Sequence, residues 1–66
     1  MRVDRVRLIA EMARQEIRIQ ELADKASVSR STINSMRGGK SCHRNSVVRV
    51  AEALGVDVEE LLEVKK

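Results

Sequence analysis

The side chains best suited to chemistry in this 66-residue chain are cations concentrated in its middle. Residues 27–51 contain no Asp or Glu and carry five basic side chains, Arg30, Arg37, Lys40, Arg44 and Arg49. The segments on either side, residues 1–26 and 52–66, mix basic and acidic side chains. A basic block free of carboxylates favours a polyanion as its partner, although a solvated basic face has the same composition.

Cys42 and His43 are the other residues that suggest chemistry. A metal site needs three or four ligands, and the chain has no second Cys or His. A Cys–His nucleophile pair needs opposed side chains and a pocket, which adjacent residues in a polar loop do not provide. Because no paired acids or phosphate-binding loop occur elsewhere, we expect no enzyme activity, no metal, no cofactor and no small-molecule substrate.

Composition narrows the class of protein further. The chain has no Phe, Tyr or Trp, the side chains on which most single-strand and RNA binders stack bases. Its single Cys cannot form an internal disulfide, and no apolar run approaches the ~20 residues of a membrane span or the pattern of a signal peptide. With 42% hydrophobic residues, the chain is expected to fold as one domain over residues 1–66. Because it has no internal disulfide, membrane span or signal peptide pattern, we expect it to be cytoplasmic.

Apolar periodicity predicts five short helices with short loops, and therefore an all-α fold. The first helix is expected over about 4–15, with an inward stripe of Val3, Val6, Ile9, Ala10 and Ala13 that Leu8 and Met12 widen. The second is expected over 19–26. The third is expected to be capped by Ser29 and to end at Gly38-Gly39.

The last two helices follow a polar loop at residues 40–44. Asn45 or Ser46 is expected to cap the fourth helix, which ends at Gly55 and buries Val47, Val50, Ala51 and Leu54. Asp57 and Glu60 have the spacing of a capping box at the start of the fifth helix. That helix is expected to end near Val64.

The second and third helices have the shape of a helix-turn-helix over about 19–37. Ala23 is small enough to let the helices approach closely where they cross, and Val28 fills the inside of the turn. Ile33 and Met36 anchor the second helix of the motif on the first. In this motif the second helix lies in the major groove of DNA, while the first crosses the backbone.

Five strings of the chain occur in an order and at a spacing typical of one family: Glu21-Leu22-Ala23, Val28-Ser29-Arg30-Ser31-Thr32-Ile33, Gly39-Lys40, Val50-Ala51-Glu52-Ala53-Leu54-Gly55-Val56 and Glu59-Glu60-Leu61-Leu62. On these residues nearly the whole chain resembles the lambda-repressor-like, Cro/CI-type (xenobiotic-response-element) helix-turn-helix domains. The resemblance implies a compact five-helix domain that regulates transcription by binding specific sequences of double-stranded DNA, as a repressor.

The chain departs from this family at several places. The family usually has Ser or Thr and then Gln at the start of the second helix, and here Arg18 and Ile19 stand there. That Gln typically contacts a phosphate, and Arg18 or Gln20 is expected to replace it. Ser27 stands at a turn position that is often Gly, where a positive φ would cost roughly 1 kcal/mol.

Helical geometry selects the candidate base-reading residues. With Ile33 and Met36 inward, a rotation of about 100° per residue turns Ser31, Asn34 and Ser35 outward. At the edge of this face, Arg30 can bind guanine O6 and N7, while Asn34 can pair with adenine N6 and N7. The resemblance also places Arg30 and Ser31 at base-reading positions. We therefore predict that DNA bases are read by Arg30, Ser31, Asn34 and Ser35.

Contacts to DNA phosphates are expected around this face, because free helix amides, close backbone approach and positive charge all suit an anion. The predicted phosphate-binding residues are Arg18, Gln20, Ser29, Arg37, Gly38, Gly39, Lys40, His43 and Arg44.

A single short recognition helix reads few base pairs, and helix-turn-helix proteins commonly bind as dimers to half-sites about 34 Å apart. The resemblance favours a homodimer contact through the fifth helix, with Val58, Leu61, Leu62 and Val64 as the contact residues. The alternative is that these four side chains pack on the first and fourth helices. A rival function is an interaction module of the same fold, such as an antitoxin, that binds another protein through the fifth helix.

Overall fold

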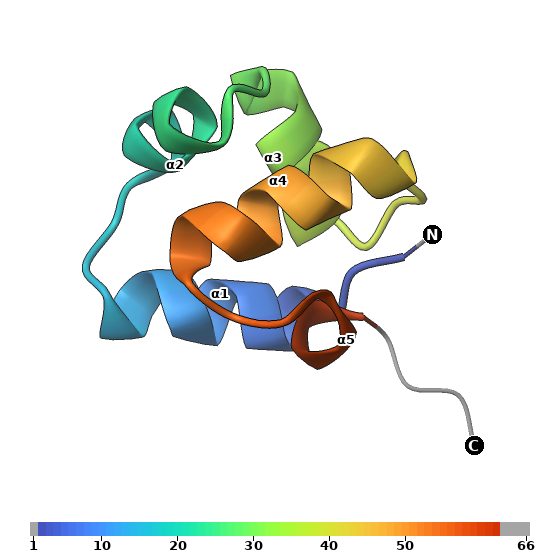
Figure 1. Ribbon diagram of the computed structural model, residues 1–66, viewed down its shortest axis with the longest axis horizontal. Helices are drawn as coiled ribbons and strands as arrows, with labels where there is room; N and C mark the ends of the chain where they lie inside the picture. Colours follow the sequence, from blue (N-terminus) through green and yellow to red (C-terminus); the bar gives the residue numbers. More distant parts are fainter. Residues whose placement is uncertain (1, 63–66) are drawn as a thin grey trace.

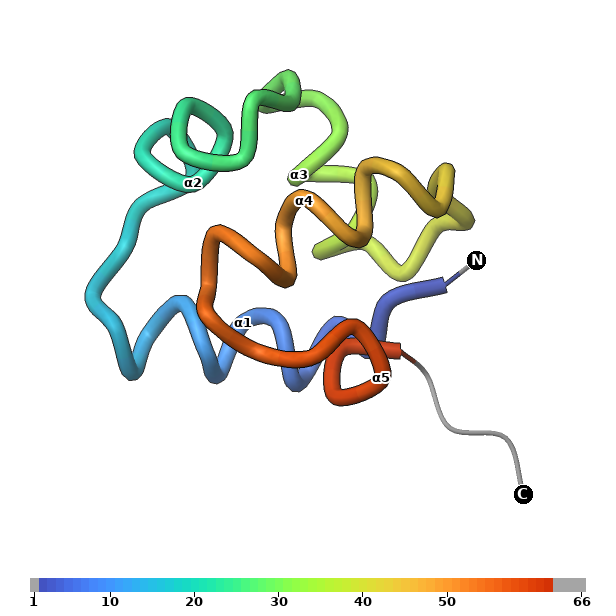
Figure 2. The backbone as a smooth tube through the Cα atoms, viewed as in Figure 1, coloured from blue at the N-terminus to red at the C-terminus, as the bar shows by residue number. Residues whose placement is uncertain are grey.

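The computed structural model describes residues 2–62, and this range contains five α-helices (Figure 1). They are α1 (Arg5–Arg14), α2 (Ile19–Ala26), α3 (Arg30–Arg37), α4 (Arg44–Leu54) and α5 (Val58–Leu61). α2 packs on α3 and α4, while α1 packs on α3 and α5. In Figure 2, α4 runs between α2 on one side and α1 with α5 on the other. The all-α, five-helix prediction is confirmed.

One apolar cluster forms the core. Its largest fully buried side chains are Leu8, Leu22, Ile33, Met36, Leu61, Val3, Val47 and Val50. Among the described residues, no polar or charged residue is buried. The core is therefore built from aliphatic side chains and Met, as the composition requires.

The helix-turn-helix has the predicted boundaries, because each local signal is satisfied. Ala23 is 4% exposed where α2 meets the rest of the core, and the Val28 amide donates to the Ala23 carbonyl across the turn at 3.0 Å. Ser29 precedes α3, and its hydroxyl oxygen accepts a hydrogen bond from the Thr32 amide at 3.1 Å. The turn and the cap together fix the direction in which α3 leaves α2.

Ser27 ends α2 in the left-handed region, with φ of 58°. Its amide donates to the Asp24 carbonyl at 3.3 Å, and its own carbonyl accepts from Arg49 Nη1 on α4 at 3.3 Å. Ser27 therefore has the positive φ that we considered for this turn position. A non-glycine side chain in this region costs about 1–2 kcal/mol of backbone strain.

Replacing Ser27 by glycine is expected to raise the free energy of unfolding by about 0.5–1 kcal/mol, because glycine relieves this strain but also gains freedom in the unfolded chain. Urea denaturation followed by circular dichroism would measure the change. Ser46→Gly is the matched control, since Ser46 lies in the first turn of α4 and glycine there is expected to lower stability by about 0.5 kcal/mol. A loss of stability in Ser27→Gly would contradict the strain assignment.

The predicted inward face of α1 is wrong for Val6, Ile9, Ala10 and Ala13 and right for Val3, Leu8 and Met12. Leu8 and Met12 are buried, whereas Ala10 and Ala13 are exposed, as are Val6 and Ile9, at 68% and 42%. Leu8 and Met12 lie four positions apart on one face of the helix, and the predicted stripe lies on the opposite face. The helix itself begins after Asp4, whose carboxylate accepts from the Val6 amide at 3.0 Å.

The N-terminal segment explains the orientation of α1. Val3, which sequence reasoning placed in the helical stripe, precedes the helix and is 1% exposed. It forms an isolated antiparallel bridge with Leu62, and Arg2 forms another with Ser41. The Asp4 amide also donates to the Leu61 carbonyl at 2.7 Å. These contacts hold the start of α1 against α5 and turn Leu8 inward.

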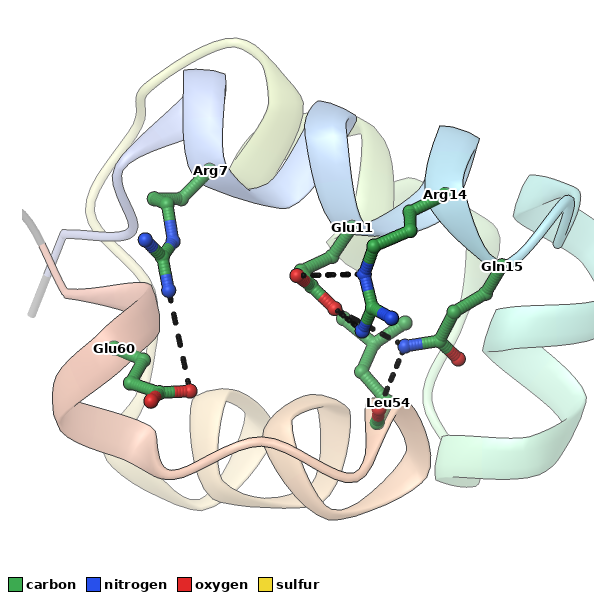
Figure 3. A network of polar contacts seen from close by, with 6 residues as sticks. All are labelled: Arg7, Glu11, Arg14, Gln15, Leu54 and Glu60. Atoms are coloured by element: carbon green, nitrogen blue, oxygen red, sulfur yellow. Dashed lines mark hydrogen bonds and ion pairs between the residues drawn. The ribbon is translucent and has the colours of Figure 1, made fainter.

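A polar network holds the other end of α1 against α4 (Figure 3). Gln15 Nε2 donates to Glu11 Oε1 at 3.2 Å and to the Leu54 carbonyl at the end of α4 at 2.7 Å. Arg14 Nη2 donates to the same Glu11 oxygen at 2.6 Å. This hydrogen bond from Arg14 holds the pKa of Glu11 below its usual value.

Two predicted helix ends need correction. α4 begins at Arg44 with His43 as its N-cap, not after Asn45 or Ser46, because the Val47 amide finds a partner in the His43 carbonyl at 3.2 Å. α5 ends at Leu61, and Val64 lies outside the described residues.

The capping box predicted at the start of α5 is also absent. Asp57 is the N-cap, but its side chain makes no cap hydrogen bond. The Glu60 carboxylate, which would have to reach back to residue 57, instead faces Arg7 Nη2 on α1 at 3.9 Å (Figure 3). This partly exposed ion pair joins α5 to α1.

Candidate nucleic-acid interface

The two faces of α3 differ sharply. Ile33 and Met36 are fully buried, whereas Arg30, Ser31 and Asn34 are exposed. The hydroxyl groups of Ser29 and Thr32 lie 2.9 Å apart and stabilise the first turn of the helix. As the spacing predicts, the helix packs on the core through Ile33 and Met36 and exposes its polar side chains.

The outward face of α3 lines an open groove of about 710 Å³ with the start of α2 and the residue after Gly39. Residues that were predicted to read bases and residues that were predicted to bind phosphates meet here. The lining residues are Arg18, Ile19, Gln20, Arg30, Ser31, Asn34, Ser35 and Lys40. All four predicted base-reading residues are present, together with three predicted phosphate-binding residues.

The groove has a net positive charge, since its lining contains three cations and no carboxylate. Over residues 2–62, the side chains of Arg18, Arg30 and Lys40 take part in none of the hydrogen bonds or ion pairs of the structure. No ion pair among residues 2–62 therefore neutralises these three charges. Such a groove suits a polyanion whose edge also carries hydrogen-bonding groups.

The start of α2 differs from the usual family arrangement in how it is capped. Arg18 is the N-cap residue and cannot accept a hydrogen bond through its side chain. Instead, the Glu21 carboxylate accepts from the Arg18 amide at 3.3 Å. The Arg18 and Gln20 side chains both line the groove.

The remaining predicted phosphate-binding residues do not line the groove. Ser29 lies at the start of α3, and the others lie at its end or beyond. Arg37 is half-buried and its Nε atom is buried without a hydrogen-bond partner, while Ser29 caps the other end of the helix. Gly39 has φ of 77°, and Arg44 begins α4. His43 lines a separate small cavity of about 140 Å³ with Thr32, Ser35, Ser41, Cys42 and Ser46.

Two basic residues beside the loop that joins α3 to α4 were not predicted from the sequence. Arg2 pairs through its backbone with Ser41, and a Cβ added to Gly39 would lie 3.9 Å from Arg5 Cδ. Both arginines are exposed. The sequence signal for these two residues is the number of arginines among the first seven residues, namely Arg2, Arg5 and Arg7. From the sequence we interpret this segment only as the start of a helix that packs on the core.

The residues predicted to form a dimer contact occupy different environments. Leu61 is fully buried in the core, and this corrects its assignment, since a side chain with no exposed surface has none to offer a second copy. Val58 and Leu62 are partly buried against the core. For Leu61, the alternative of packing inside the domain is the one that the structure shows.

No helix in residues 2–62 has the length and apolar character needed to cross a membrane. A family model for the Cro/C1-type HTH DNA-binding domain matches residues 7–66. Comparison with curated proteins gives no match. Among solved structures, a mutant of hydroxyethylphosphonate dioxygenase is similar with a TM-score of 0.86 and 23% sequence identity, over 100% of this chain and 14% of that one. At this identity the likeness shows the fold alone.

Proposed function

Because the chain belongs to the Cro/C1-type HTH DNA-binding domain family, we propose that it regulates transcription by reading the major groove of double-stranded DNA with α3. One observation carries the proposal. The exposed side of α3 contributes Arg30, Ser31 and Asn34 to a groove that three cations and no carboxylate line. These are the residue types that pair with guanine and adenine edges and with phosphates.

The proposed division of labour follows from position. Arg30 and Asn34 read bases, with Ser31 and Ser35 beside them. Arg18, Gln20 and Lys40 at the rim bind phosphates and set the affinity, helped by the backbone at Gly38 and Gly39. We propose repression as the outcome, since occupying a site is by itself enough to keep other proteins from it.

We also propose that the protein binds as a homodimer. One helix of eight residues contacts too few base pairs for high specificity, and pairing two copies on half-sites about 34 Å apart removes that limit. Val58 and Leu62, on or next to α5, retain exposed surface, and Val64 follows them in the sequence. Selection of binding sites from a random DNA library tests both proposals. An inverted repeat is expected, whereas recovery of no preferred sequence would reject base reading.

Lys40→Ala is expected to weaken binding to all DNA sequences alike and to reduce the slope of log affinity against log salt by about one unit. The reason is that an unpaired ammonium at the rim of the groove releases one counterion from a phosphate when it binds. Titration of the selected site and of a scrambled duplex at several salt concentrations measures the slope.

Lys25→Ala is the matched control for Lys40→Ala, because Lys25 is an exposed lysine on α2 that does not line this groove. Its slope is expected to stay at the wild-type value. Equal changes in the two variants would place the phosphate contact elsewhere.

A further inference from the structure

The outward face of α1 carries apolar side chains that the core does not use. Val6, Ile9, Ala10 and Ala13, hereafter the α1 stripe, are all exposed. Val6 and Ile9 are the exposed large hydrophobic residues of the described chain. Single exposed apolar residues need no explanation, but these four follow the i, i+3, i+4, i+7 spacing by which one helix binds another.

The shape of the α1 stripe suits a helix. Ala10 and Ala13 are small and allow close approach of a second backbone, while Val6 and Ile9 project beyond them. The ten residues of α1 span about 15 Å, which is long enough for close to three turns of a partner helix. None of the residues that line the α3 groove comes from α1, so a partner on this stripe leaves that groove open.

The charge beside the α1 stripe is positive on both sides. Helical rotation places Arg5 along one edge and Arg7 with Arg14 along the other. The one carboxylate of this helix, Glu11, is turned toward α4 with its side chain only 15% exposed, and it already pairs with Arg14 Nη2 at 2.6 Å. The Arg7–Glu60 pair spans 3.9 Å with both side chains about half exposed, so it opposes a new carboxylate partner only weakly.

We propose that the α1 stripe is a docking site for an amphipathic helix of another protein, with an apolar ridge flanked by carboxylates. Charge decides against a second copy of the chain, because two facing α1 helices would bring their arginines together in either orientation. An acidic helix instead places its carboxylates opposite Arg5 and Arg7, since Arg14 already pairs with Glu11. This proposal does not depend on DNA binding.

Two synthetic helical peptides with the same leucine ridge provide the test, one flanked by Glu and the other by Lys at the same positions. With the isotope-labelled protein, the Glu peptide is expected to bind and to shift the backbone amide resonances of α1, while those of the α3 groove stay in place. The Lys peptide is expected not to bind.

The variant Val6→Ser with Ile9→Ser is expected to weaken binding of the Glu peptide by about tenfold or more, because both large anchors are removed. Lys25→Ser is the matched control on another exposed helix surface, and its affinity for the peptide is expected to be unchanged. Because the α1 stripe is exposed and lies outside the α3 groove, the double variant is expected to keep its helical circular dichroism and its affinity for DNA.

Three results would overturn the proposal. The first is failure of the Glu peptide to bind, and the second is equal binding of both peptides. The third is a dimer in sedimentation that dissociates in the Val6→Ser, Ile9→Ser variant, since a second copy would then occupy the α1 stripe. Failure of the wild-type chain to bind DNA would reject the proposed function without altering the peptide result.

Discussion

Leu8→Ala is expected to lower the free energy of unfolding by about 2–5 kcal/mol, because Leu8 is fully buried and its truncation removes apolar contacts and leaves a cavity. A domain of 66 residues is stabilised by roughly 3–10 kcal/mol, so the variant would lose a large part of its stability. Urea denaturation monitored by circular dichroism would show the midpoint falling with little change in slope.

The neighbouring substitution Ile9→Ala is the control. Ile9 is 42% exposed, and alanine is the better helix former, so stability is expected to change by no more than about 0.5 kcal/mol. Truncating Leu8 would thus lower the free energy of unfolding several-fold more than truncating Ile9, although the two side chains have similar volumes. Equal losses at the two positions would mean that α1 does not pack on the face that carries Leu8.

Arg30→Ala and Asn34→Ala are each expected to cost about 1–3 kcal/mol of binding free energy on the selected DNA site, or about 5- to 150-fold in affinity. Each side chain lines the α3 groove and is exposed, so each is available for a bidentate contact with one base. The preference for that base is expected to relax, while the other positions of the site keep theirs. Affinity measured on single-base variants of the site would show this.

Arg30→Lys separates charge from geometry, since lysine keeps the positive charge but lacks the planar fork of donors. It is expected to keep the wild-type salt dependence and to lose most of the base preference. Asn45→Ala is a matched control for Asn34, because Asn45 is exposed on α4 and does not line the groove. Unchanged base preference in both alanine variants of α3 would reject base reading by these residues.

The helix-turn-helix could be predicted in detail from the sequence because its signals are local. Ser29 caps the start of α3 through its own hydroxyl, and Gly38 caps its end, two residues beyond the buried Met36. Ala23 and Val28 are the small and medium apolar residues that the turn requires. Each of these constraints acts within a few residues, so the outward face of α3 and most of the groove follow from it.

The orientation of α1 could not be predicted in this way, because its sequence carries two apolar faces. Leu8 and Met12 lie on one, and the α1 stripe lies on the other. Periodicity identifies both but does not show which one is buried. The choice is made by contacts distant in sequence, between Val3 and Leu62 and between Gln15 and Leu54.

The starts of α4 and α5 were mispredicted because side-chain caps contribute little, about 1 kcal/mol each. At α4, the backbone bond from Val47 to His43 extends the helix past the better capping residues, Asn45 and Ser46. At α5, the Glu60 carboxylate faces Arg7 rather than the helix start. In both cases a contact that cannot be recognised from the sequence outweighs the weak preference for a side-chain cap.

The antiparallel bridge between Val3 and Leu62 brings the beginning and the end of the described chain to one edge of the domain. A polypeptide entering before residue 3 and one leaving after residue 62 would therefore run from neighbouring points. A domain with adjacent termini can be placed inside a longer chain without separating the segments on either side of it. This geometry makes the domain a unit that tolerates both fusion and insertion.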